Sequence, residues 1–409
     1  MTLPRIRVVL VSALVILGVA LAIQPGEAHK AITSKYTFND DVFPIVRDRC
    51  ASCHVTGGIA PMSLMTYDDA FPWAESIRAE LVAAHMPPGN PDEGYGAVKR
   101  AHRLTPKELD VILTWATGGN PRGALDQTLP PVALKNDWTI GAPDLLLQMP
   151  APFTVAADKM EDWQEFTLPT GTTEARWVRA VDLLPGTPSI VRSATIVVKS
   201  TGGQNAGASP EHVLAFWLPG QDPAAADGVA FKLPAGAQIG VRIHYKKTWQ
   251  FEGKPLTDRS TIGVYFSQGS TAQELLALPI DSPAAVSGGA DQTVRFNHTL
   301  AEDMVALARS PDKVPGNITL QVEAVKPDGS RVPMIRLNTR ADWDRRYWFE
   351  KPVTLPRGTR VEVSANLADP DILSAAFTST PGTGVAPARP SSMRLTLNVI
   401  PARSKPTAP

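Results

Sequence analysis

The chain has 409 residues, of which 20% are charged, and its 40 basic and 40 acidic residues leave no formal net charge at pH 7. It lacks the basic surplus typical of proteins that bind nucleic acid or anionic membranes, so we expect neither partner. The length exceeds what one hydrophobic core usually supports, which predicts two or three domains, and the 38 prolines and 30 glycines favour short strands and turns over long helices.

The N-terminus is typical of an export signal. Arg5 and Arg7 precede an apolar run from Val8 to Ile23, and small residues follow at Gly26 and Ala28. The run is shorter than the roughly 20 residues of a membrane-spanning helix. We therefore predict a signal peptide over residues 1–28, cleavage, a periplasmic or otherwise exported protein, and no stable membrane insertion. A retained N-terminal anchor that leaves the protein facing the periplasm is the alternative.

Cys50-Ala51-Ser52-Cys53-His54 is the attachment motif of a c-type haem. Its thiols, the only two in the chain, are spaced to add to the two vinyl groups of a haem, and the histidine follows where it can ligate the iron. A thioredoxin-like site needs a βαβ context, a zinc knuckle needs further ligands, and a disulfide across so short a loop stabilises little. The motif therefore predicts one covalent haem c on Cys50 and Cys53, with His54 on the iron.

Two helices are predicted on either side of this motif. Residues 38–50 place apolar side chains at helical spacing behind a capping Asn39 or Asp40. Thr105 to Glu108 form a capping box that begins a second apolar stripe, which ends at Gly118. Two such helices at the ends of a small haem domain resemble a class I cytochrome c. The resemblance implies a small all-α domain over residues 29–120.

The sixth iron ligand is expected between the two helices. Met86-Pro87-Pro88 follows an amphipathic segment and resembles the loop that carries the axial methionine of such cytochromes. Proline fixes the backbone and offers no competing N–H, and a thioether is a soft, neutral ligand that raises the potential. Met86 is therefore the predicted ligand. The remaining candidates in this stretch are Met62, Met65, His85 and His102.

An all-β region is predicted to follow a proline-punctuated linker at residues 121–137. The stretches Ile239 to Tyr245 and Val361 to Leu367 alternate apolar and polar residues, and each comes after a Leu-Pro-x-Gly turn. The pattern predicts two β-sandwiches, at residues 138–270 and 285–401, with residues 402–409 as a tail.

Short motifs in the β region occur in a specific order: Asp137 to Asp144, Arg176 to Val181, Leu218-Pro219-Gly220, Ile243-His244-Tyr245, Asp258 to Val264 and Pro327 to Ser330. This order resembles bacterial relatives of the copper type II ascorbate-dependent monooxygenases, the peptidylglycine and dopamine β-monooxygenase group. Many of those relatives carry an N-terminal c-type haem domain. The resemblance implies two jelly-roll sandwiches with a cleft between them. With the first domain, the expected fold class is a small all-α class I cytochrome c-like domain followed by all-β tandem jelly-roll sandwiches.

Most copper ligands that the resemblance implies are missing. Arg192-Ser193 stands at the place of a His-His pair, and the stretch near Met304 has no histidine. His244 remains as the candidate copper ligand, although a solvated or hydrogen-bonded strand histidine is the alternative; His212 and His298 have no supporting spacing. A single imidazole does not hold copper, so copper is not expected.

These features predict an exported monohaem c-type cytochrome that transfers electrons to or from a redox partner protein. Its degenerate monooxygenase-like β region would bind that partner or position the haem, and no catalytic residue is assigned. The alternatives are a copper- and haem-dependent monooxygenase with an unknown substrate and a non-enzymatic redox-sensing binding protein.

Overall fold

The computed structural model describes residues 33–99, 103–199, 212–223, 227–267, 273–283, 293–343, 345–367 and 392–402. Strands account for 41% of the structure and helices for 15%. The predicted signal peptide and all but the first residue of the predicted tail lie outside the described residues. Within the described ranges, no helix is both long enough and apolar enough to span a bilayer.

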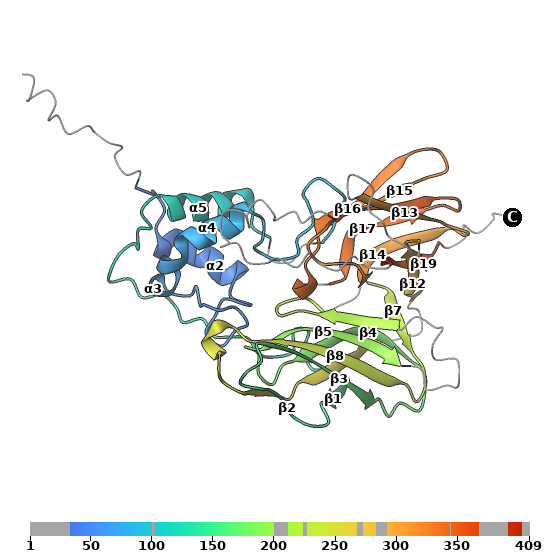
Figure 1. The fold of residues 1–409 in the computed structure, drawn as a ribbon, viewed down its shortest axis with the longest axis horizontal. Coiled ribbons are helices and arrows are strands. Elements are labelled where there is room, and N and C mark those ends of the chain that lie inside the picture. Colours follow the sequence, from blue (N-terminus) through green and yellow to red (C-terminus); the bar gives the residue numbers. More distant parts are fainter. Residues whose placement is uncertain are drawn as a thin grey trace, which may run out of the picture.

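The N-terminal segment carries the helices, which lie together at one end of the molecule (Figure 1). They are η1 (Phe38–Val42), α2 (Phe43–Arg49), α3 (Tyr67–Ala70), η2 (Phe71–Trp73), α4 (Ala74–Val82) and α5 (Pro106–Thr117). The side chain of Thr105 accepts a hydrogen bond from the Glu108 N–H and Pro106 follows, so α5 begins with the capping box that the sequence predicted. Trp115 of α5 is fully buried against the ring of Phe38, with the ring centroids 5.7 Å apart.

The first β unit consists of two sheets around one core. One sheet has the order β3-β8-β5-β6 and the other β1-β10-β4-β7-β11, and a two-stranded sheet pairs β2 with β9. All pairings are antiparallel except that of β11 with β7. The strands are β1 (Leu145–Gln148), β2 (Phe153–Val155), β3 (Glu161–Pro169), β4 (Arg176–Leu184), β5 (Val191–Lys199), β6 (His212–Trp217), β7 (Val229–Leu233), β8 (Gln238–Lys246), β9 (Leu256–Asp258), β10 (Thr261–Phe266) and β11 (Gln273–Glu274); the short helix η3 (Trp249–Phe251) follows β8.

The second β unit consists of two four-stranded sheets around a core of its own. Their orders are β12-β19-β14-β17 and β13-β18-β15-β16. In β18 every second residue is buried, as its alternating sequence predicted. The strands are β12 (Leu276–Asp281), β13 (Thr293–Thr299), β14 (Met304–Lys313), β15 (Thr319–Val325), β16 (Arg331–Asn338), β17 (Tyr347–Leu355), β18 (Arg360–Asn366) and β19 (Arg394–Pro401), and the short helix η4 (Ala341–Trp343) precedes β17.

The predicted fold class, a small all-α class I cytochrome c-like domain followed by tandem jelly rolls, is wrong. The described chain is predominantly β, and its longest helix, α5, has 12 residues. Outside these short helices, residues 33–99 and 103–135 are mainly turns and irregular chain. Glycines with positive φ, such as Gly57, Gly94 and Gly96, explain part of this, because they adopt turn conformations that end regular structure.

The helical segment is fastened to the second β unit by the chain that follows α4. The Asp92 N–H donates to the Arg336 carbonyl at 2.7 Å, and Val98 forms a bridge with Phe349 of β17. Gly96 lies so close to β16 that a Cβ atom there would be 2.0 Å from the Met334 carbonyl oxygen. The helices and the second β unit therefore meet over a close backbone contact.

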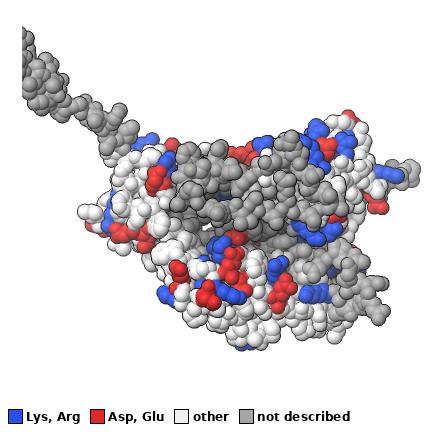
Figure 2. Space-filling view, viewed as in Figure 1, with Lys and Arg blue, Asp and Glu red and all other residues white. Residues whose placement is uncertain are grey.

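Figure 2 shows acidic and basic side chains interspersed over the described part of one face, as the absence of net charge implies.

Candidate functional site

A cavity of about 360 Å³ lies where the helical segment meets both β units. The helical segment contributes the motif cysteines, His54 and one face of α4, and the β units contribute a wall of their own. Most of the side chains that line the cavity are apolar. The residues that line it include Arg49, Cys50, Cys53, His54, Met62, Trp73, Ile77, Leu81, Met86, Arg192, Leu218, Trp343 and Arg345.

The end of α2 presents the motif to this cavity. Cys50 caps the helix, with its N–H bonded to the Val46 carbonyl, and the N–H groups of Cys53 and His54 both donate to the Cys50 carbonyl. The resulting turn brings all three side chains to the cavity wall. Burial raises the pKa of Cys50 to about 12 and also raises that of Cys53. Both thiols are therefore neutral, unlike the low-pKa thiolate of a redox-exchange or nucleophilic cysteine.

His54 is held in the tautomer that suits an iron ligand. Its Nδ1 lies 3.2 Å from the Met62 carbonyl oxygen, and a carbonyl can only accept, so Nδ1 carries the proton. Burial lowers the pKa of His54, which keeps the imidazole neutral. The lone pair of Nε2 is then available for a metal, in the arrangement common among ligating histidines.

The structure separates the candidates for the sixth ligand. Met86 and Met62 line the cavity, whereas Met65 is buried in the core of the helical segment and His85 places Nδ1 3.1 Å from a Glu80 carboxylate oxygen. His102 lies outside the described residues. Met62 is also held next to His54, because its backbone carbonyl accepts the His54 proton, so Met86 and Met62 are the two candidates that could supply a thioether to a group in the cavity.

The loop that carries Met86 is held from two directions. The Met86 N–H donates to the Glu80 carbonyl at 3.3 Å, which ties the loop to the end of α4. From the second β unit, Arg345 donates to the Gly89 carbonyl at 2.5 Å and to the Asn90 side chain at 3.3 Å, while the Tyr347 hydroxyl donates to Gly89 at 2.9 Å. The β region therefore positions the candidate ligand, which the sequence alone did not predict.

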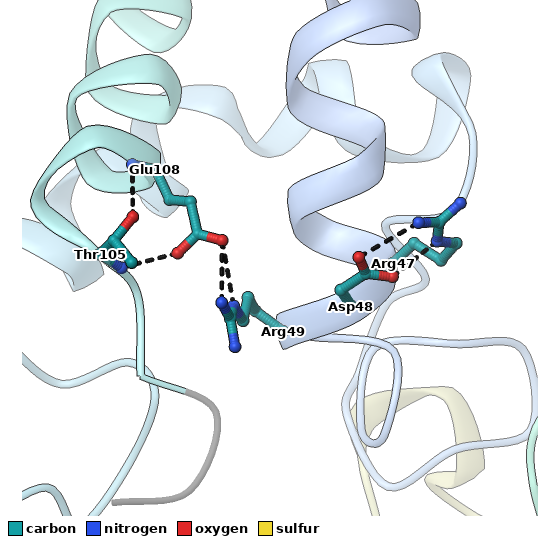
Figure 3. Close-up of polar contacts among 5 residues, drawn as sticks. All are labelled: Arg47, Asp48, Arg49, Thr105 and Glu108. Atoms are coloured by element: carbon teal, nitrogen blue, oxygen red, sulfur yellow. Dashed lines mark hydrogen bonds and ion pairs between the residues drawn. The ribbon is translucent and has the colours of Figure 1, made fainter.

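A salt bridge braces the motif end of α2 against the start of α5 (Figure 3). Arg49 donates from Nε and Nη2 to one carboxylate oxygen of Glu108, at 3.2 and 3.0 Å, and the Thr105 N–H donates to the other. The Thr105 backbone N–H, followed by Arg49, lowers the pKa of Glu108. Both side chains are partly exposed, so the pair contributes at most about 1 kcal/mol, but it fixes the direction in which the motif leaves α2.

His244, the candidate copper ligand, lies in a separate cluster. It is 1% exposed, its ring stacks on Trp163 at 3.8 Å, and its Nε2 lies 2.5 Å from Glu161. Ligand atoms of Glu161, His244 and Asp342 lie within 4.8 Å of one another, and no sequence motif predicted that the two acids would join His244. The Lys246 ammonium lies 2.6 Å from Asp342 and 4.0 Å from Glu161, so a lysine already supplies positive charge at this cluster.

The two residues at the place of the His-His pair face different cavities. Arg192 lines the cavity of the motif cysteines, whereas Ser193 lines a larger cavity of about 480 Å³ between the two β units, together with His212. His298 lies in β13 and lines neither cavity. The histidines that the sequence offered for a rearranged copper site therefore do not converge on His244.

No family model matches the chain, and no curated protein matches it. Among solved structures, allantoicase aligns at 9% identity over 60% of this chain and 79% of that chain, with a TM-score of 0.17. The structure of Sulfolobus Turreted Icosahedral Virus aligns at 10% identity over 66% of this chain and 99% of that chain, with a TM-score of 0.14. Scores this low carry no argument about fold or function.

The identification of the chain as a cytochrome c fused to a copper type II monooxygenase-like region is therefore wrong. The described chain is mostly β with short helices, and no family model supports either identification. The protein classes expected with it, cytochrome c, haem protein and monooxygenase-like protein, conflict with this β-rich fold of few, short helices, and no comparison supports them.

Proposed function

We propose that the cavity holds one haem, joined by thioethers to Cys50 and Cys53, and that this exported protein transfers electrons to or from a redox partner protein. The proposal is made from the site alone and not from the fold. The observation that carries it is the convergence of both cysteines, His54 and Met86 on one largely apolar cavity. Its volume, about 360 Å³, falls within the range of roughly 300–1,000 Å³ usual for cofactor and ligand sites.

Each residue has a role that its surroundings support. Cys50 and Cys53 anchor the group covalently, and the neutral His54 offers Nε2 to the iron because its Nδ1 proton is engaged by Met62. Met86 supplies a thioether from a loop that is tied at both ends, and such a ligand favours the reduced iron. A bound haem supplies one-electron chemistry.

The surroundings of the site suit electron transfer to another protein. The exposed apolar side chains include Phe71 and Val82, at the two ends of the α4 segment, and Met86 at the cavity itself. The exposed Met86 keeps a group in the cavity within reach of a partner protein. The β units contribute Leu218, Trp343 and Arg345 to the cavity, so their role in this proposal is to position the haem and to complete its wall.

Covalent haem is tested on protein produced with a haem-attachment system. The wild-type chain should retain haem stain in a denaturing gel and contain about one iron per chain. Cys50→Ser combined with Cys53→Ser should lose the stain, because no other thiol exists in the sequence. Ser52→Ala, between the two cysteines, is the matched control and should keep it. Wild-type protein that carries a Cys50–Cys53 disulfide and no haem, or stain that persists in the double variant, would refute the proposal.

A further inference from the structure

We propose that Arg192, supplied by the first β unit, binds a carboxylate of the group in the cavity. The inference rests on the proposed function, in which that group is haem, because haem carries two propionate side chains. It assigns to the β region a direct contact with the cofactor, which extends its role beyond completing the wall.

Arg192 faces the cavity, and none of the described residues is its polar partner. It stands at the start of β5, and its guanidinium lies over the ring of Trp343, 5.3 Å from the centroid. Its Nε is buried and unbonded, and Arg192 makes no hydrogen bond or ion pair with any residue in the described ranges. A buried guanidinium nitrogen that lacks an acceptor is costly, which points to an acceptor for Nε supplied by something other than the described residues.

The two other arginines of the cavity wall are already engaged. Arg49 donates to Glu108, and Arg345 donates to the Gly89 carbonyl of the Met86 loop. Arg192 is thus the cavity arginine whose donors remain for a ligand.

The two nearby carboxylates are paired with other residues and not with Arg192. Asp342 is bonded to Lys246 at 2.6 Å, and Glu161 is bonded to His244 at 2.5 Å. These carboxylates favour the charged form of Arg192 without contacting it, and burial acts in the opposite direction by lowering its pKa. A charged guanidinium in a largely apolar cavity selects an anion, and its planar fork matches a carboxylate in particular.

The test is a redox titration of the haem-loaded protein at several pH values. Arg192→Gln removes the charge, and Arg192→Lys keeps the charge without the fork. Arg242→Gln is the matched control, since Arg242 lies on the neighbouring strand β8, pairs with Glu165 and does not line this cavity. All variants should keep covalent haem stain.

Arg192→Gln should lower the equilibrium constant for reduction about tenfold, which is about 59 mV for one electron. Its potential should also fall as pH rises between about 5 and 8, because a carboxylate that loses its cation titrates nearer neutrality. Arg192→Lys and Arg242→Gln should keep the wild-type pH profile. Haem-loaded Arg192→Gln with an unchanged potential and profile would overturn this inference alone, whereas wild-type protein without haem would overturn it together with the proposed function.

Discussion

Replacing Arg346 by methionine should loosen the boundary between the two β units. Arg346 precedes β17 of the second unit, is 7% exposed, and donates to the carbonyls of Val213 and Leu214 in β6 of the first unit, at 2.8 and 2.9 Å. Its Nε also reaches Ser310 and Asn398, each at 3.1 Å. Burial lowers the pKa of Arg346 to about 9, which leaves the guanidinium charged at pH 7.

The expected loss follows from these contacts. Methionine keeps much of the apolar stem but removes the donor to two carbonyls of an edge strand, while the Asn398 side-chain oxygen keeps the hydrogen bond from the Ser310 hydroxyl. Hydrogen bonds to a charged group contribute about 1.5–3 kcal/mol each, and removing the buried cation recovers several kcal/mol of its desolvation cost. We therefore expect a net destabilisation of about 3 kcal/mol.

Equilibrium urea unfolding, followed by tryptophan fluorescence, measures this loss. Arg242→Met is the control, because Arg242 is 55% exposed and its ion pair with Glu165 should contribute under about 1 kcal/mol. Limited proteolysis should cut Arg346→Met faster than wild type between the β units. A free energy of unfolding for Arg346→Met within about 0.5 kcal/mol of the control variant would refute the reasoning, because about 3 kcal/mol should separate a buried contact from an exposed one.

Two further predictions concern the ligand loop and a buried acid. Met86→Ala should abolish the weak charge-transfer absorption that an iron–methionine bond gives at the red end of the spectrum, while Met62→Ala should keep it; the reverse result would assign the ligand to Met62. Burial raises the pKa of Asp182, so its stabilising contribution is full below the unfolded value of 3.8 and is lost as pH rises through the folded pKa. Asp182→Asn cannot ionise, so it does not share this loss. In urea titrations its stability relative to wild type should therefore increase from pH 4 to pH 7, and a constant difference between the two would contradict this.

Local signals in the sequence predicted local structure. The capping box from Thr105 to Glu108 begins α5, and the alternation of β18 places every second residue in a core. Both signals lie within a few residues, so the backbone geometry follows from the sequence directly. A correct prediction of the fold class would have required knowing how much of the chain around the helices is irregular. The spacing of apolar residues within a helix carries no information about the chain outside it.

Predicting the whole site would have required knowledge of contacts between distant segments. Cys50, Cys53 and His54 share one motif, and Met86 was predicted from its loop, but Arg192 and Arg345 reach the cavity only because the β units fold against the helical segment. No periodicity marks such residues, because their neighbours in space are 100 or more positions away in the sequence.

The buried state of His244 has the same origin. It shares the polar face of β8 with Arg242, and that pattern favoured a solvated or hydrogen-bonded side chain; the structure has it hydrogen-bonded to Glu161. In the sheet, Trp163 of β3 lies directly opposite His244 and covers its ring, which leaves it 1% exposed. A cross-strand aromatic residue can thus bury a position that alternation assigns to solvent.

Part of the family resemblance rests on turn chemistry, because Leu218-Pro219-Gly220 and Pro327 to Ser330 are turns. Gly236 and Gly358, which end two of the Leu-Pro-x-Gly turns, have φ of 67° and 85°, and a turn of this geometry needs glycine in any β protein. Such motifs recur wherever strands reverse, so their order weakly identifies a family. The departure at Arg192-Ser193 is the more informative feature, because Arg192 lies at a β-bulge between Val191 and Ser193, and Arg192 and Ser193 face two different cavities. A position where an expected ligand is missing therefore becomes the position where this chain presents a cation to its own site.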